Sequence, residues 1–204
     1  MKKSLVIIVI FTTGCGHLDI SQFPQEKPVM LGTNGWSSLA LSNECNRLKE
    51  KFNIPAIAVP VHYWNWNLDE VETAKAEGRR IILIGYSAGW HQQAVLFAEE
   101  CRKRDIEIDL LVGIDPSYTV DHDFYVPSNV KEIILYFSTA KGDLMAWARG
   151  NENKIRATKD PRIKSIRYLS CSHLKCITQP TLQTDLEELI KHYSLSTRLA
   201  LSKN

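Results

Sequence analysis

The sequence predicts a single α/β domain with a mainly parallel sheet of about six strands flanked by helices. Short runs of apolar, β-prone residues alternate along the chain with stretches in which apolar residues recur at helical spacing. Several of the short runs are apolar throughout, which is typical of parallel strands that helices cover on both faces. A length of 204 residues fits one domain around one core.

The predicted strands and helices follow one another in a regular order. The strands cover Pro28–Leu31, Ala56–His62, Ile81–Ile84, Ile108–Ile114, Glu132–Phe137 and Ser165–Leu169. Helical spacing is clearest in the sets Leu41, Cys45, Leu48 and Phe52, then Ala94, Ala98 and Cys101, and finally Leu182, Leu186, Leu189 and Tyr193. Gly78 stands where a helix should end. Sites in such sheets form at the carboxyl ends of the strands, so the residues after each strand are the first functional candidates.

The N-terminus, MKKSLVIIVIFTTGCG, has the form of a secretory signal with two lysines, an apolar run and small residues. The apolar run is too short to span a bilayer as a mature helix, and the alternative is a first buried strand. Residues Thr12 to Cys15 resemble the lipobox of bacterial lipoproteins, in which the cysteine is lipidated, although Thr12 replaces the usual leucine. We therefore expect residues 1–15 to be a signal peptide and the protein to be exported to the cell envelope. Cys15 would anchor it to the membrane; otherwise it would be periplasmic or secreted.

The remaining chain is expected to divide into a linker over 16–27, a folded domain over 28–195 and a C-terminal tail over 196–204. The net charge is +2 and no block of Lys or Arg stands out, so nucleic acid is not an expected partner.

Five cysteines are present, and an exported protein could pair those that carry no lipid. Cys45 and Cys101 fall on the apolar faces of predicted helices, so we expect buried thiols there. Cys171 and Cys176 bracket His173, but their spacing is no known zinc signature. We expect neither a metal nor another cofactor.

The stretch Gly85-Tyr86-Ser87-Ala88-Gly89 follows an apolar strand and precedes an amphipathic helix. In this context the G-x-S-x-G pattern predicts a catalytic serine on a tight strand-to-helix turn, with Ser87 as the nucleophile. The amide of Ala88, at the N-terminus of the helix, would donate to a developing oxyanion. The alternative is an ordinary turn, because Ser and Gly are common turn residues.

An acid and a histidine follow later strands. Asp115 comes directly after the strand Ile108–Ile114, and Asp143 is the alternative acid after the next strand. His173 comes after the last strand and before the last helix. The chain order Ser87, Asp115 or Asp143, His173 resembles the order nucleophile, acid, base of the α/β-hydrolases.

Two further groups of residues are candidates for the surroundings of the serine. The loop Gly32-Thr33-Asn34-Gly35 follows the first strand, and the amide of Thr33 or Asn34 is a candidate second oxyanion donor; the alternative is a simple turn. Tyr86, Trp90 and Trp64 are candidates for the walls of a substrate cleft, although aromatic residues near Trp64 could instead cover the sheet edge.

Residues 28 to about 193 resemble a compact α/β-hydrolase of the bacterial lipase/esterase type. The resemblance rests on Ile81–Gly89, Asp109–Pro116, Val126–Ser138 and the late His173. It implies a serine hydrolase that cleaves a carboxylic ester or thioester of a small or lipid-like substrate, and it adds weight to Asp115 as the acid. The usual first two strands and a lid insertion are missing. The rival hypothesis is a non-catalytic envelope lipoprotein that uses the hydrolase scaffold to bind a partner.

Overall fold

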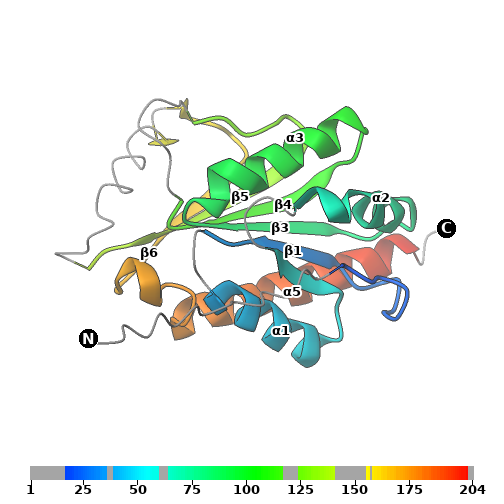
Figure 1. Cartoon of the computed structure of the whole chain (residues 1–204), viewed down its shortest axis with the longest axis horizontal. Coiled ribbons are helices and arrows are strands. Elements are labelled where there is room, and N and C mark those ends of the chain that lie inside the picture. The colour runs from blue at the N-terminus through cyan, green and yellow to red at the C-terminus, as the bar shows by residue number, and fades with distance from the viewer. Residues whose placement is uncertain are drawn as a thin grey trace, which may run out of the picture.

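The computed structural model describes residues 17–35, 39–59, 64–116, 124–140, 155, 156 and 158–201; the side chains of 64, 66, 92 and 196–201 are outside this description. Its centre is a six-stranded sheet in the order β2-β1-β3-β4-β5-β6, and each neighbouring pair is parallel (Figure 1). The strands are β1 (Val29–Thr33), β2 (Ala56–Val59), β3 (Ile81–Tyr86), β4 (Ile108–Ile114), β5 (Val130–Ser138) and β6 (Ile163–Leu169). The predicted fold class is therefore confirmed.

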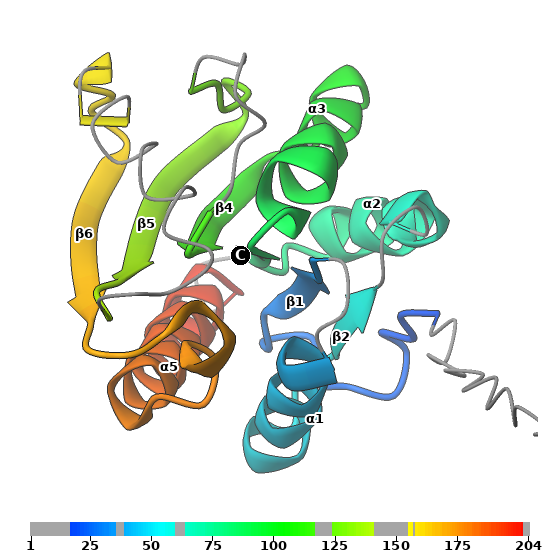
Figure 2. The same ribbon diagram turned by 60° about the vertical axis from the view of Figure 1, so that its left-hand side comes forward.

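Helices cover both faces of the sheet (Figures 1 and 2). The α-helices are α1 (Leu39–Phe52), α2 (Leu68–Ala76), α3 (Val95–Lys103) and α5 (Pro180–Leu201); the short helices are η1 (Trp64–Asn67), η2 (Trp90–Ala94) and η4 (His173–Lys175). One hydrophobic cluster joins the sheet to α2 and α3, and a second joins it to α1 and α5. Residues 196–201, expected to begin a tail, continue α5, because nothing in this stretch interrupts the helix.

The central strand β3 shows why its sequence is apolar throughout. Ile81 and Leu83 belong to the cluster under α2 and α3, whereas Ile82 and Ile84 belong to the cluster under α1 and α5. Because successive side chains of a strand point to opposite faces, both sets are buried only if both faces are covered. The alternation also explains why hydrophobic periodicity alone identifies this strand poorly, while length and β-branched content identify it well.

Residues 17–27, expected to form a linker, pack on the domain instead. Leu18 and Ile20 are 2% and 6% exposed and belong to the hydrophobic core. The buried guanidinium of Arg79 donates to the carbonyl oxygens of Ile20, Phe23 and Pro24. Most residues of the segment are polar, but the buried side chains of Leu18 and Ile20 and the hydrogen bonds from Arg79 hold it on the domain. Composition alone does not predict these contacts. The predicted signal peptide and Cys15 lie outside the described residues.

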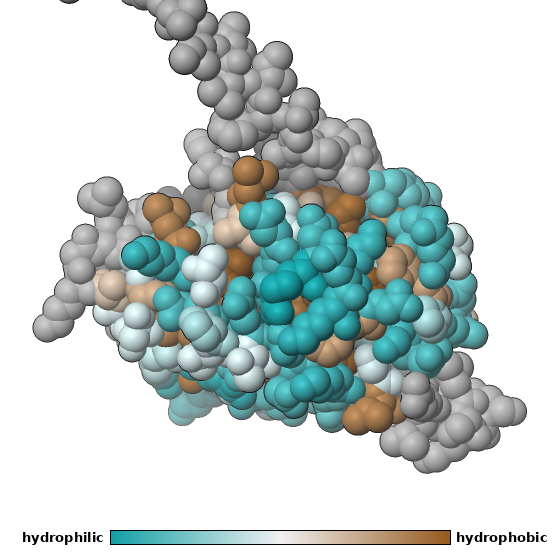
Figure 3. Space-filling view, turned by 90° about the horizontal axis from the view of Figure 1, so that it is seen from below, coloured by the Kyte–Doolittle hydropathy of each residue, from teal (hydrophilic) through white to brown (hydrophobic). Residues whose placement is uncertain are grey.

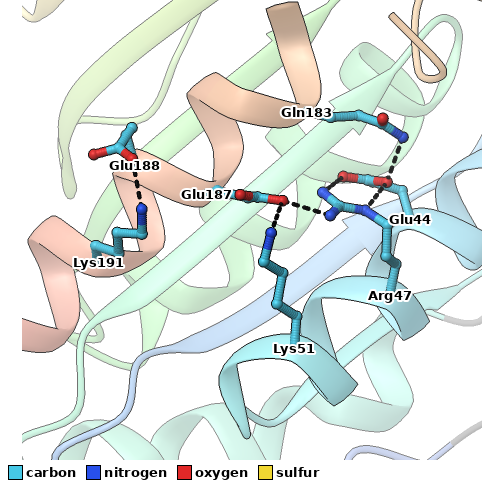
Figure 4. Close-up of polar contacts among 7 residues, drawn as sticks. All are labelled: Glu44, Arg47, Lys51, Gln183, Glu187, Glu188 and Lys191. Carbon is cyan, nitrogen blue, oxygen red and sulfur yellow. Dashed lines mark hydrogen bonds and ion pairs between the residues drawn. The ribbon is translucent and has the colours of Figure 1, made fainter. Parts of the chain in front are cut away.

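The helices α1 and α5 are also joined by charged side chains (Figure 4). Arg47 on α1 contacts the buried carboxylate of Glu44 at 2.7 Å and Glu187 of α5 at 2.5 Å. Lys51 contacts the same Glu187, and Gln183 donates to Glu44. Seen from below, the centre of this side of the molecule is mostly hydrophilic (Figure 3). The contacts fix α5, the helix that follows the loop carrying His173.

Candidate active site

Three predicted site residues meet at the carboxyl end of the sheet. Ser87 follows β3, Asp115 follows β4, and His173 lies in the loop between β6 and α5. The Nε2 atom of His173 lies 2.9 Å from the Oγ of Ser87, and its Nδ1 atom lies 2.6 Å from Oδ2 of Asp115. Because an ionised carboxylate only accepts hydrogen bonds, the ring proton belongs on Nδ1, and Nε2 is then the acceptor for the serine hydroxyl. All three side chains are buried.

The turn at Ser87 explains the two glycines that flank the motif. Ser87 has a φ of 56°, in the left-handed region, and its amide donates to the carbonyl of Ile114. A Cβ at Gly85 would lie 2.7 Å from Cα of Trp90, and a Cβ at Gly89 would lie 2.3 Å from the carbonyl oxygen of Thr33. Both positions need glycine because strand, helix and neighbouring loop approach too closely for any side chain.

Trp90 was expected to line a substrate cleft, but it is fully buried in the core. Its ring stacks on Phe124 with centroids 6.3 Å apart. A Cβ at Gly113 would lie 2.8 Å from the Trp90 ring, so the glycine in β4 makes the space that the indole fills. The expectation was wrong because Gly113 has no side chain, and the indole packs against the sheet in the space that a side chain would occupy. The side chain of Trp64 is not described.

Asp115 is held by the end of the neighbouring strand. It has a φ of 44°, and its amide donates to the carbonyl of Tyr136 at 2.7 Å. Its carboxylate accepts from the hydroxyl of Ser138 at 2.7 Å and from the amide of Ser138 at 3.2 Å. Ser138 ends β5, and the sequence analysis did not single it out; its position at a strand end was the available signal. The alternative acid, Asp143, lies outside the described residues.

Tyr86, also expected in a cleft wall, supports His173. Its hydroxyl donates to the carbonyl of His173 at 2.8 Å, and the two rings stack with centroids 5.1 Å apart and planes 20° apart. Tyr86 is only 2% exposed. The variable position before the serine therefore contacts the backbone and the ring of the histidine, a contact that no local sequence pattern encodes.

The loop after β1 lies next to the serine, but the backbone amide of one predicted oxyanion donor already has a hydrogen-bond partner. The amide of Asn34 donates to the carbonyl of Val59 at 3.1 Å, because the pairing of β1 with β2 continues past the strand end. The next residue, Gly35, lies against the nucleophile. A Cβ at Gly35 would be 3.0 Å from Cβ of Ser87 and 3.3 Å from its Oγ. Gly35 is the residue of this loop that sequence reasoning overlooked.

Side chains fix this loop from both sides. The hydroxyl of Thr33, the other predicted donor residue, lies 3.1 Å from the carbonyl of Ile84 and 2.9 Å from that of Gly89. Gln93, fully buried on η2, donates from its side-chain amide to the carbonyl of Asn34 at 2.8 Å. Loop, strand and helix are therefore joined around the serine before any substrate binds.

Within the described ranges, no group of three or more His, Cys, Asp or Glu side chains is arranged to hold a metal ion. Across these same ranges, no helix has both the length and the apolar character needed to cross a bilayer.

No family model matches the chain, and no curated protein matches it in sequence. Solved structures are similar in fold. An esterase from Pyrobaculum calidifontis has a TM-score of 0.52 at 14% identity, over 85% of this chain and 77% of that one. The esterase LipW from Mycobacterium marinum has a TM-score of 0.53 at 11% identity, over 88% and 75%. The RedJ thioesterase from Streptomyces coelicolor has a TM-score of 0.52 at 12% identity, over 86% and 93%. The chain therefore has the α/β-hydrolase fold.

Proposed function

We propose that the protein is a serine hydrolase that cleaves a carboxylic ester or thioester through an acyl-enzyme intermediate. The observation that carries this proposal is the continuous hydrogen-bonded line from Asp115 through His173 to Ser87, with distances of 2.6 Å and 2.9 Å. Its place at the carboxyl end of a parallel sheet supports it, as do the names of the similar structures, which include esterases and a thioesterase.

In the first half of the reaction, the Oγ of Ser87 attacks the carbonyl carbon while its proton passes to Nε2 of His173. Asp115 keeps the Nδ1 tautomer and stabilises the imidazolium that forms. When the tetrahedral intermediate collapses, His173 gives the proton to the departing alcohol or thiol, and the acyl group stays on Ser87. Water then attacks this acyl group by the same route, which releases the acid and restores the serine.

The oxyanion that forms in each half needs donors on the side of the serine away from the histidine. We assign this role to the amide of Ala88, at the start of the helical segment, and to the amide of Gly35. Gly35 replaces Asn34 in this role because the Asn34 amide already donates to Val59, whereas Gly35 lies against Ser87. Removing one such donor in other hydrolases costs about 10²–10³ in kcat, so the rigidity of this loop matters.

The substrate we propose has an apolar acyl or alkyl part. Leu174, directly after His173, is 73% exposed and presents an apolar surface next to the loop of the proposed site. The feature fits a lipid-like or short-chain ester better than a charged one.

Labelling with a fluorophosphonate probe tests the proposal, because the probe reacts only with an activated serine. We expect the folded wild type to be labelled, and labelling to be lost in Ser87→Ala and His173→Ala. Ser128→Ala and His192→Ala change an exposed serine and an exposed histidine elsewhere, so both controls should keep full labelling. A folded wild type that is not labelled would overturn the proposal and favour the binding scaffold.

We also propose that the chain is exported and lipidated at Cys15. The proposal rests on the sequence of residues 1–15 alone. Expression in a bacterial host with radiolabelled palmitate should label the wild type and leave Cys15→Ser unlabelled. Unlabelled wild type in the medium or periplasm would instead indicate simple secretion.

A further inference from the structure

The loop that carries His173 has a cysteine on either side of the histidine. The Sγ atoms of Cys171 and Cys176 lie 3.3 Å apart. Both side chains are buried, at 5% and 0% exposure. The described chain has two other cysteines, Cys45 and Cys101, and the two hydrophobic clusters place Cys101 on the opposite face of the sheet. Cys171 and Cys176 are therefore two cysteines of one loop whose sulfur atoms lie in contact.

Both cysteines are anchored by the backbone at opposite ends of the loop. The carbonyl of Cys171 accepts from the amide of Ala140, which ties it to the chain that continues from β5. The amide of Cys176 donates to the carbonyl of His173 at 3.2 Å, which closes the short helix η4. Both sulfurs belong to the apolar cluster that includes Leu169 and Ile177. The backbone thus brings the thiols together while His173 keeps its contacts with Ser87 and Asp115.

We propose that Cys171 and Cys176 are a redox pair that forms an intramolecular disulfide and closes the His173 loop into a covalent ring. A disulfide bond is about 2.05 Å long, so the two sulfurs need to approach by roughly 1.3 Å, which small side-chain rotations provide. The product is less polar than two thiols and suits the apolar cluster around it. The inference does not depend on the proposed hydrolase activity.

The oxidant we name is a low-molecular-weight disulfide such as oxidised glutathione. The thiolate of one cysteine attacks this disulfide, forms a mixed disulfide and releases one glutathione as thiolate. The second cysteine, after losing its own proton, attacks the protein sulfur of the mixed disulfide and releases the second glutathione. Two protein thiols are oxidised, one glutathione disulfide is reduced to two thiols, and no other reactant is needed.

Cys45 and Cys101 provide the internal comparison. Burial raises the pKa of the Cys45 thiol far above its usual range and that of the Cys101 thiol to about 12. They lie on helices that pack on opposite faces of the sheet, so they cannot form a disulfide with each other as Cys171 and Cys176 can. These two cysteines should remain thiols under conditions that oxidise the pair.

Mass spectrometry of the full chain tests the proposal. The folded protein is incubated with oxidised glutathione, quenched in acid, alkylated under denaturing conditions and digested with trypsin. Trypsin cuts after Arg167, Lys175 and Lys191, so the two cysteines fall in separate peptides, 168–175 and 176–191. We expect these peptides to be joined, with the loss of two hydrogen atoms, and the peptides with Cys45 and Cys101 to be alkylated.

Variants make the result specific. Cys45→Ala/Cys101→Ala should oxidise as the wild type does, whereas Cys176→Ser should stop at a glutathione adduct on Cys171 or not react. In the oxidised wild type, amide hydrogen exchange over residues 170–176 should slow by about tenfold, because the ring restricts local opening. Two results would overturn the proposal: folded protein whose Cys171 and Cys176 stay alkylatable at every glutathione ratio, or disulfides to other cysteines instead. If amide hydrogen exchange over residues 170–176 is unchanged in the cross-linked protein, the proposed restraint on the loop is wrong.

Discussion

Strand β4 has a buried aspartate at each end, and the two have different partners. Asp109, near its start, and Asp115, just after its end, are each 2% exposed. Asp109 forms ion pairs with Arg80 at 2.8 Å and Lys131 at 3.3 Å, and accepts from a backbone amide. Asp115 accepts from the hydroxyl and amide of Ser138 and contacts only the ring of His173 among ionisable groups in the described part of the chain.

The difference separates a structural charge from a functional one. Permanent cations around Asp109 offset the cost of burying its charge, so this carboxylate stays ionised in the folded state without needing to change. Asp115 is satisfied by neutral donors and by an imidazole whose own charge can change. A carboxylate in this second environment stabilises a cation that forms only during a reaction, which is the role we propose for it.

The largest expected effect is on activity, from Asp115→Asn. The amide cannot hold the correct tautomer of His173 or stabilise its charged form, so we expect kcat to fall by about 10⁴-fold. Stability should change by less than about 1 kcal/mol, because no fixed cation loses its partner. Steady-state hydrolysis of a chromogenic short-chain ester, with urea unfolding of the same samples, measures both quantities. Near-normal kcat in this variant would indicate that Asp143 or another acid serves the histidine.

The matched change at the other end of the strand, Asp109→Asn, should have the opposite profile. Lys75, Arg80 and Lys131 would lose the carboxylate they surround. These cations are partly exposed, so we expect a loss of about 2–3 kcal/mol in unfolding free energy, below the range for fully buried pairs. The kcat of the folded protein should stay within about twofold, since this end of the sheet is remote from Ser87. A destabilisation under about 0.5 kcal/mol would contradict the structural role assigned to Asp109.

A smaller effect is expected from Ser138→Ala, which removes the hydroxyl that orients Asp115. We expect kcat to fall by about tenfold, as for other residues that orient a functional group through a hydrogen bond, and stability to fall by about 1 kcal/mol. Ser138→Thr keeps the hydroxyl on a strand that tolerates β-branching, so it should restore most of the activity. Equal losses in the alanine and threonine variants would indicate a packing effect instead.

The smallest effect concerns pH and Glu107, which shares Lys75 and Lys131 with Asp109. Burial opposes ionisation, but hydrogen bonds from Lys131 and Lys75 outweigh it and hold the pKa of Glu107 below its ordinary value of 4.5. A lowered pKa means that the stabilisation is present above pH 4.5 and is lost as the pH falls through the folded-state pKa. Glu107→Gln should therefore lose less stability between pH 7 and acid pH than the wild type. Urea midpoints are measured across this pH range. If the midpoint changes equally with pH in the wild type and in the variant, this prediction is wrong.

The six strands and the order of the three site residues are set by local pattern, and for that reason the sequence is sufficient to predict them. Apolar runs of strand length identify the strands, and the residues that follow them identify Ser87, Asp115 and His173. The boundaries are less well predicted: β5 begins at Val130, earlier than expected, and β1 ends at Thr33, after the predicted Leu31, while the predicted end of the second strand, His62, lies outside the described residues. Strand ends depend on which backbone groups find partners in the neighbouring strand, and pattern alone does not supply that information.

Other features are decided by contacts between segments far apart in the sequence. The packing of residues 17–27 depends on Arg79, and the burial of Trp90 depends on the space left at Gly113. The support of His173 by Tyr86 joins residues that no local pattern relates.

The sequence by itself determined the parallel α/β architecture and the set of residues at the carboxyl ends of its strands, because hydrophobic periodicity and motif spacing are local properties. Only the tertiary structure decided the distances of 2.6 Å and 2.9 Å around His173, the position of Gly35 against Ser87 and the 3.3 Å separation of the two sulfurs. These depend on how strands register and how side chains compete for the same space, and that competition is settled only when the whole domain has packed.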